Sequence, residues 1–254
     1  MLYGLYLSTA GALVETTRVE TVANNLANAN TPAFRRDFAV FAERATEARE
    51  NDVPFFDVNK TLERIGGGLQ LDETPYVRAD GSLTPTDNPL DLAIEGPGYF
   101  AVRDVRPDGK VRFTRAGNFT RNHDGLLVTP DGKYRVLDRG GDAIRLPDDG
   151  NLTIDRTGRL MNGDVEVAKL DLRTADPSEL RKYGDNTYEF IGDGEPEQIE
   201  GLVLQGMLEG STVNPVIEMV SMINGHRAYE ANMRLITQQD RTLQRAVNDI
   251  GRAV

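Results

Sequence analysis

The 254-residue chain contains no cysteine and no tryptophan, and its two histidines are His123 and His226. Without cysteine the chain forms no disulfide and no thiolate metal site, which suits a reducing compartment or a protein exported without oxidative folding. With so few histidines, a metal site would need a cluster of carboxylates, and no acidic group has the required spacing. We therefore predict that the protein holds no metal and no cofactor.

The sequence also lacks long apolar runs and a basic excess. No stretch approaches eighteen uninterrupted apolar residues, so we expect no insertion into a membrane. The apolar start, "MLYGLYLSTAGALV", precedes the first basic residue, Arg18, and so lacks the positive region of a cleaved signal peptide. With 29 Lys and Arg against 40 Asp and Glu, the chain has a net charge of −11, which makes nucleic acid an unsuitable partner.

The negative charge is concentrated in the middle of the chain. Residues 1–50 carry 5 basic and 6 acidic side chains, residues 206–254 carry 5 and 5, and the middle carries 19 and 29. Net charge of one sign keeps a surface solvated. We interpret the near-neutral ends as contact regions and the acidic middle as the part that faces solvent.

The first segment has an apolar residue at every seventh position. The row consists of Leu5, Ala12, Val19 and Leu26, and Thr31-Pro32 follows it. A period of seven indicates an amphipathic helix, and the residue before a proline disfavours helical backbone. The sequence therefore predicts an N-terminal helix of about four heptads.

A longer row of the same spacing follows Pro215. It consists of Met222, Tyr229, Ile236, Leu243 and Ile250, and a second row three positions before some of its members consists of Met219, Met233 and Val247. This pattern predicts a long helix with an a/d seam that supercoils against another helix. A helix with such a stripe could instead pack on the β domain of its own chain, and the pattern leaves both arrangements open.

Between these helices the apolar period changes to two. Segments such as "LDLAI", "YFAVR" and "YRVLD" alternate, and "PDGK", "HDGL" and "DDGN" are turn signals between them. Short alternating strands joined by Asp-Gly turns predict a mainly antiparallel β domain over residues 76–205. We expect an α+β fold in which residues 1–34 and 206–254 form a discontinuous coiled-coil domain and residues 35–75, with the glycines 66–68, form an extended connecting segment.

No group of residues predicts catalysis. His123-Asp124 precedes a turn glycine, and no nucleophile elbow of the G-x-S-x-G type is present. Two alternatives to a structural protein remain at this point. One is an extracellular adhesion or binding module with a coiled-coil stalk, and the other is a carbohydrate hydrolase using two carboxylates about 5 to 9.5 Å apart.

Longer motifs at both ends resemble a known family. "STAGAL" and "ANNLANANTPAFRRD" near the start, with "GMLEGSTVNPVIEMVSMINGHRAYEANMRLITQQDRTL" near the end, resemble the flagellar basal-body rod and hook family of axial proteins. The central "NPLDLAIEGPGYFAV", "FTRAGNFTRNHDGLLVTPDGKYRVL" and "LTIDRTGRL" resemble the β domain that these proteins share. The chain departs from the family at Ala33, where members often have glycine.

The resemblance implies a structural subunit of the flagellar rod that assembles helically into the hollow shaft between basal body and hook. It implies a homo-oligomer that also contacts other rod or hook axial proteins, and export by the flagellar type III apparatus to a basal body spanning the periplasm. The wording "LEGSTVNPVIEM" is closest to the proximal-rod type and "RAYEAN" to the distal-rod type, and we favour the proximal type slightly.

The resemblance and the heptad rows together give a set of expected assembly-interface residues. Four asparagines at the end of the first helix are expected to form hydrogen bonds between neighbouring subunits, since a heterologous contact needs directionality as well as apolar area. The full set is Leu5, Val19, Asn24, Asn25, Leu26, Asn28, Asn30, Glu209, Asn214, Met219, Met222, Arg227, Tyr229, Glu230, Ile236 and Leu243.

Overall fold

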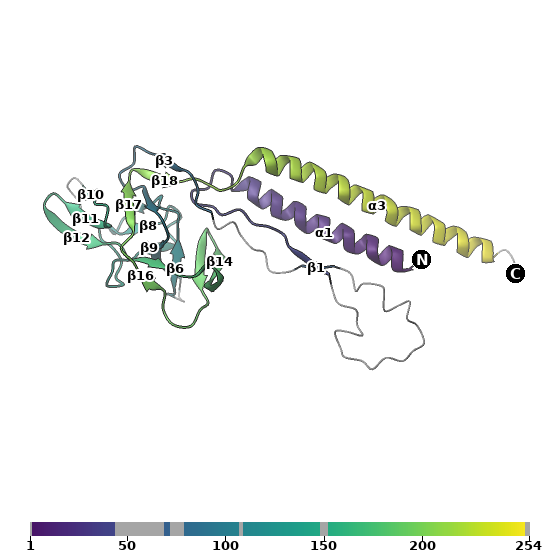
Figure 1. Ribbon diagram of the computed structural model, residues 1–254, viewed down its shortest axis with the longest axis horizontal. Helices are drawn as coiled ribbons and strands as arrows, with labels where there is room; N and C mark the ends of the chain where they lie inside the picture. The colour runs from purple at the N-terminus through teal and green to yellow at the C-terminus, as the bar shows by residue number, and fades with distance from the viewer. Residues whose placement is uncertain (1, 44–68, 72–78, 107–108, 148–151, 252–254) are drawn as a thin grey trace. The chain divides into compact units, whose positions relative to one another are not determined.

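The computed structural model describes residues 2–43, 69–71, 79–106, 109–147 and 152–251 (Figure 1). The chain divides into two compact units. The helical unit comprises Met1–Ala27, Arg36–Val77 and Val213–Val254, and the β unit comprises Asn28–Arg35 and Arg78–Thr212. The glycines at 66–68, and with them most of the expected connecting segment, lie outside the described residues.

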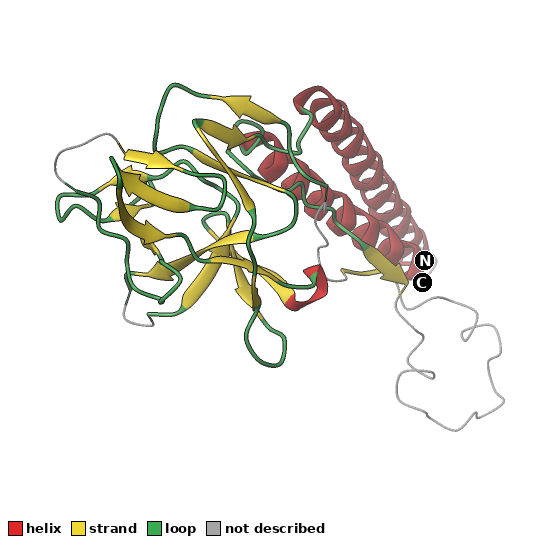
Figure 2. Cartoon of the chain, turned by 60° about the vertical axis from the view of Figure 1, so that its left-hand side comes forward, coloured by secondary structure: helices red, strands yellow, loops and turns green. Residues whose placement is uncertain are grey.

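The helical unit is built on two helices, α1 (Leu2–Ala27) and α3 (Pro215–Gly251). They lie side by side and run in opposite directions, so both chain ends lie at the same end of the pair (Figures 1 and 2). Two short strands, β1 (Phe41–Glu43) and β2 (Leu69–Leu71), pair antiparallel in the same unit.

The start of α3 follows directly from its sequence. Asn214 caps the helix, since its Oδ1 accepts the backbone N–H groups of Val216 at 3.1 Å and Ile217 at 3.4 Å. Pro215 occupies the first helical position, where a missing N–H costs no hydrogen bond.

Glycines bring the two helices close together. A Cβ atom added to Gly4 would lie 3.1 Å from the Gln239 side chain, and one added to Gly11 would lie 3.2 Å from that of Asn232. Both contacts advance by seven residues, in opposite directions along the two helices, as expected for an antiparallel heptad packing. On the other helix, a Cβ at Gly225 would lie 2.7 Å from Val19 Cγ2, which is too close for a real contact.

The β unit contains the remaining strands. They are β3 (Leu83–Pro85), β4 (Leu92–Glu95), β5 (Tyr99–Asp104), β6 (Val111–Thr114), β7 (Thr120–Arg121), β8 (Leu127–Val128), β9 (Tyr134–Val136), β10 (Leu152–Ile154), β11 (Arg159–Asn162), β12 (Val165–Lys169), β13 (Leu172–Thr174), β14 (Leu180–Gly184), β15 (Thr187–Phe190), β16 (Glu197–Gln198), β17 (Leu202–Gln205) and β18 (Met207–Glu209), with one 3₁₀ turn, η2 (Pro177–Glu179). Within the described residues the largest sheet has the order β14-β15-β6-β5-β9-β8-β7, with β13 paired to β5 and β16.

Three smaller sheets complete this unit. They have the orders β10-β11-β12, β17-β4 and β18-β3. The strand pairings of the described chain are all antiparallel. In the hairpin β14–β15 the two loop residues, Asp185 and Asn186, have φ of 48° and 56°, which is the backbone of a tight turn that matches strand twist.

The core of the β unit is apolar and partly aromatic. Phe100 and Phe119 pack edge to face with ring centroids 5.2 Å apart, and Leu92, Val102 and Leu160 are fully buried beside them in the same cluster. Burial of apolar surface on this scale is the main stabilising term of a folded domain.

The expected α+β fold is confirmed. The chain has an N-terminal and a C-terminal helix, and a mainly antiparallel β region lies between them in sequence. Among the helices that the structure describes, none combines the length and the apolar character that crossing a membrane requires.

Candidate assembly surfaces

On α3, the expected row of apolar residues at every seventh position faces α1. The second expected row, three positions earlier, does not. Met222, Tyr229, Ile236 and Leu243 are half-buried, and the residues that share their side of the helix are Gly225, Asn232, Gln239 and Ala246. The expected second row, Met219, Met233 and Val247, is 46%, 39% and 69% exposed. The close approach to α1 occurs at Gly225, Asn232 and Gln239, so small or flat side chains accompany the row of seven on this side of α3.

The row predicted on α1 lies on the same interface. Leu5, Val19 and Leu26 are half-buried and Ala12 is buried, while Ser8 and Val22 complete the inward side of the helix. Both heptad rows are therefore used, at least in part, to pack the two ends of one chain against each other.

Asn25 is buried within its own chain. Its Nδ2 donates to the carbonyl of Asp37 at 2.9 Å, and its Oδ1 accepts the N–H of Asp37 at 2.9 Å. The side chain is only 1% exposed. The Asn25 amide thus bonds to both backbone groups of Asp37, as a residue of a paired strand would. It holds residues 36–43, which we call the returning chain, against the end of α1.

The other asparagines of the motif lie nearer to solvent. Asn24 and Asn30 are exposed, and Asn28 is half-buried with its Oδ1 accepting the hydroxyl of Thr31 at 3.0 Å.

Arg36 and Glu218 form an ion pair that attaches the returning chain to α3. Arg36 Nε lies 2.5 Å from Glu218 Oε1, and Glu218 is fully buried in the first turns of α3. A buried carboxylate requires a cation beside it, because burial strongly disfavours an isolated charge. The pair therefore fixes residue 36 to the start of the C-terminal helix.

The neighbouring arginine, Arg35, takes part in a separate cluster in the β unit. Arg35 lies 2.7 Å from Glu209 and 3.0 Å from Asp80, and Arg115 lies 3.2 Å from Asp80 and 3.7 Å from Glu209. Arg35, Arg115 and Glu209 are all buried. Two cations and two carboxylates balance each other, and the Gly81 N–H donates to Glu209 at 2.9 Å.

This cluster anchors the short segment 28–35 in the β unit. Lys182 Nζ donates to the Arg35 carbonyl at 2.6 Å, and Asn186 Nδ2 donates to the Pro32 carbonyl at 2.7 Å. Ala33 is buried and has φ of 54°, a left-handed backbone that glycine adopts without strain. The alanine that departs from the family pattern therefore occupies a position suited to glycine.

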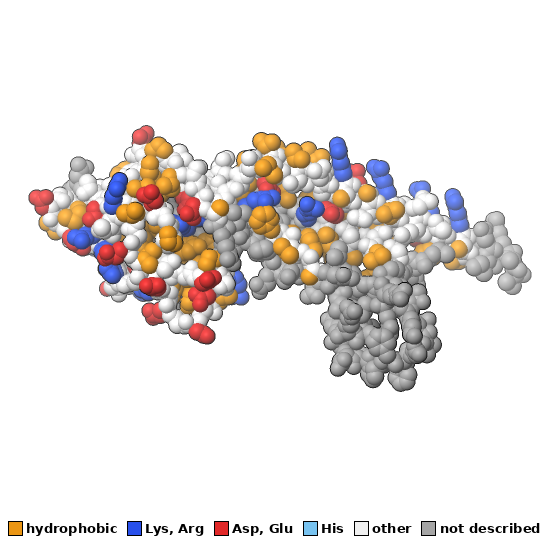
Figure 3. Space-filling view, viewed as in Figure 1, with side chains coloured by type: hydrophobic (Ala, Val, Ile, Leu, Met, Phe, Trp, Pro, Cys, Tyr) orange, Lys and Arg blue, Asp and Glu red, His pale blue; other side chains and the backbone are white. Residues whose placement is uncertain are grey.

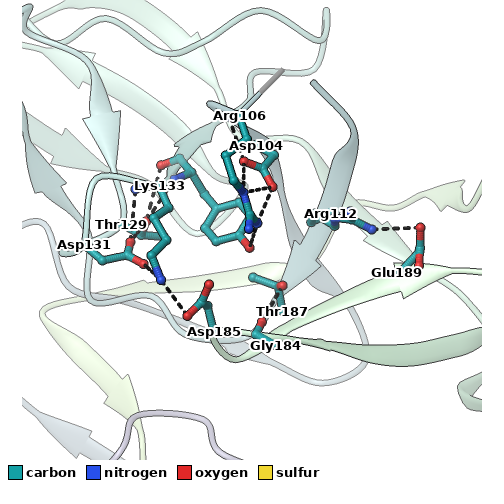
Figure 4. Close-up of polar contacts among 11 residues, drawn as sticks. Asp104, Arg106, Arg112, Thr129, Asp131, Lys133, Gly184, Asp185, Thr187 and Glu189 are labelled. Carbon is teal, nitrogen blue, oxygen red and sulfur yellow. Dashed lines mark hydrogen bonds and ion pairs between the residues drawn. The ribbon is translucent and has the colours of Figure 1, made fainter. Parts of the chain in front are cut away.

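A further polar network lies on the β unit, away from these segments in sequence (Figure 4). Arg106 donates to both carboxylate oxygens of Asp104 and, at 3.0 Å, to the hydroxyl of Tyr134. Arg106 also holds the pKa of the Asp104 carboxyl below its usual range. Lys133 Nζ lies 2.7 Å from Asp185 in the β14–β15 hairpin. Many acidic residues of the middle region are thus paired with cations rather than free on a solvated surface.

The remaining expected residues occupy the outer side or the start of α3. Arg227 and Glu230 are exposed, and Glu230 lies 3.6 Å from Arg234 in a weak pair along the helix. Asn214 is the helix cap described above.

The structure reveals an exposed surface of which the heptad rows indicated Met219 alone. Five apolar side chains at the start of α3 are between 46% and 64% exposed. They are Val216, Ile217, Met219, Val220 and Ile223, and we call them the collar. Figure 3 shows apolar atoms over this stretch, and basic side chains project from the rest of the helix. Large exposed apolar patches usually mark interaction sites.

Among the described residues, no group of three or more His, Asp or Glu side chains is placed to hold a metal ion. The two packed helices leave an apolar surface exposed, and the β unit has a hydrophobic core of its own. These features are those of a structural protein that assembles with other subunits.

Comparison with known proteins specifies the family. Three family models match, described as "Flagella basal body rod protein" (residues 8–35), "Flagellar hook protein FlgE/F/G D1 domain" (residues 93–162) and "Flagellar basal body rod FlgEFG protein C-terminal" (residues 204–249). Two relatives from Caulobacter vibrioides are the flagellar basal-body rod proteins FlgF and FlgG. The first is 34% identical over 254 residues, 98% of each chain, and the second 32% over 264 residues, 94% of this chain and 96% of the relative.

A third relative, the rod protein FlgG of Buchnera aphidicola subsp. Schizaphis graminum, is 31% identical over 96% of this chain and 98% of its own. The chain belongs to the flagellar basal-body rod protein family, and its function is that of a structural rod subunit.

Proposed function

We propose that the protein forms part of the flagellar rod as an open helical assembly, in which copies contact one another through the helical unit. The observation that carries this proposal is the collar. Because α1 and α3 use one stripe to pack on each other, the five apolar side chains of the collar have no partner role inside that pair. A contact that repeats between unlike surfaces extends without closing, as a shaft requires.

The proximal-rod type is the more suitable assignment. The segment "LEGSTVNPVIEM" favours the proximal-rod type. We further propose that the protein acts without catalysis, spans the periplasm within the basal body together with other rod or hook proteins, and is exported by the flagellar apparatus as an unfolded chain.

Purified basal bodies from cells expressing a tagged copy test the assignment. We expect the tag to label the rod near the inner membrane, and cells without the gene to lack hook and filament and to be non-motile. A tagged protein that complements motility but is absent from basal bodies would contradict a structural role, and a label near the hook would indicate the distal type.

A further inference from the structure

The helical unit carries a groove at the same level as the collar. The groove has a volume of about 330 Å³. Its lining comes from α1, from residues 36–41 and from Ser221 of α3, and it includes Val14, Arg18, Val22, Asp37 and Ala39. Ser221 lies between Val220 and Met222 on α3, so groove and collar share one level of the helix pair.

The collar cannot fill the groove of its own copy. None of its five side chains lines the groove, and all five are about half exposed or more. Apart from Ile217, which precedes Ser221 by about one helical turn, they lie on other sides of α3 than Ser221. A volume of about 330 Å³ corresponds to on the order of ten waters, which leaves room for more than one branched aliphatic side chain. Burying apolar side chains there would remove the exposed surface that the isolated chain retains.

We propose that the collar of one copy docks into the groove of a second copy beside it. This inference rests on the proposed function and names the surfaces that meet. Since collar and groove lie at one level but face different directions, each copy offers a collar on one side and a groove on the other. The contact is heterologous and lateral, and a small axial shift at each step converts a ring into a helix.

Charge supports a second copy as the occupant. Apart from the buried Glu218, the stretch from Pro215 to Ile223 carries no charge, so it enters the groove without like-charge conflict. Glu230 follows Ile223 by seven residues on the same stripe, and Arg18 precedes Asn25 by seven residues on α1. Because α1 runs opposite to α3, a parallel neighbour with Ile223 beside Asn25 places Glu230 beside Arg18.

The absence of cysteine makes disulfide cross-linking a clean test. In the full chain, Val220→Cys places a thiol in the collar and Ala39→Cys places one in the groove. Oxidation of basal bodies containing the double variant should give a ladder of linked copies, whereas each single variant should give none. Dimers from Val220→Cys alone would indicate a symmetric contact and overturn the proposal.

Two further outcomes would also overturn it. They are a double variant that is present in basal bodies but forms no ladder, and a disulfide to a protein of different mass. Absence of the unmodified protein from basal bodies would instead overturn the proposed function and this pairing with it.

A charge swap provides a second test. Arg18→Glu and Glu230→Arg, each in the cysteine-pair background, should lower the cross-linked fraction about fivefold, and the double swap should restore it. Arg245→Glu changes an exposed cation outside the pairing and should have no effect. A double swap that is no better than either single change would contradict the predicted pair.

Discussion

The two units of the protein are stabilised in different ways. The β unit buries a dense cluster of aromatic and aliphatic side chains and pairs most of its inner charges, as in the Arg35–Glu209 and Arg106–Asp104 contacts. The helical unit packs glycines against flat amide side chains and leaves its collar exposed. The β unit thus has a hydrophobic core of its own, while the helical unit exposes five apolar side chains at the start of one helix, which further contacts can bury.

The largest expected effect comes from removing Arg35. Arg35→Ala leaves Glu209 buried without its closest cation, which costs about 3–5 kcal/mol. We expect amide hydrogen exchange of the β5 and β9 core to accelerate accordingly, with no change along α1.

The adjacent arginine supplies the matched variant. Arg36→Ala removes the partner of Glu218 and should accelerate exchange in residues 36–40 and at the start of α3, while the β core stays protected. If the two variants had the same exchange pattern, the division into separately stabilised units would be wrong.

A charge in the helix interface should have the next largest effect. Ile236 is half-buried on the side of α3 that faces α1, so Ile236→Asp should destabilise the helix pair by about 2 kcal/mol or more. Circular dichroism should show lower helicity, and cells carrying the variant should fail to swim. Arg245→Ala, at an exposed position, is the control and should leave helicity and swimming nearly unchanged. Normal helicity in the Ile236→Asp protein would contradict the packing of α3 on α1.

Acid should destabilise the β unit. Hydrogen bonds from Arg106 and from Arg181 lower the folded-state pKa values of Asp104 and Glu189, respectively. Because these groups bind protons more readily in the unfolded state, their stabilisation is present above the unfolded pKa of about 4 and is lost as the pH falls through the folded values. Urea midpoints of the β unit measured between neutral pH and pH 3 should fall, and Asp104→Asn should flatten part of that dependence.

The smallest expected effect concerns Ala33. Its φ of 54° is a left-handed backbone that strains alanine and not glycine, so Ala33→Gly should raise the stability of the β unit by no more than about 1 kcal/mol. Ala33→Val should instead lower it by about 1–3 kcal/mol. Thermal unfolding of the unchanged protein and the two variants gives the order of their stabilities. A valine variant as stable as the glycine variant would exclude backbone strain at this position.

The heptad rows and the alternating strands were sufficient to predict the fold. The period of seven identified both helices, and the Asp-Gly turns identified the antiparallel region, because each is a local pattern. The row facing α1 was only half predicted, since glycine and glutamine carry no hydrophobic signal although a close helix approach requires them. The pairing of Arg35 with Glu209 and Arg36 with Glu218 joins segments far apart in sequence, and no local pattern indicates which of two adjacent arginines meets which acid.

The most direct test compares hydrogen exchange in the free subunit and in assembled rods. If the helical unit is the assembling part, amides of Val216–Ile223 and of residues 36–40 should exchange markedly more slowly in rods, while the core strands β5 and β9 keep the rates of the free protein. Slower exchange in the β core with an unchanged collar would contradict the account, because assembly would then use the unit that is already complete.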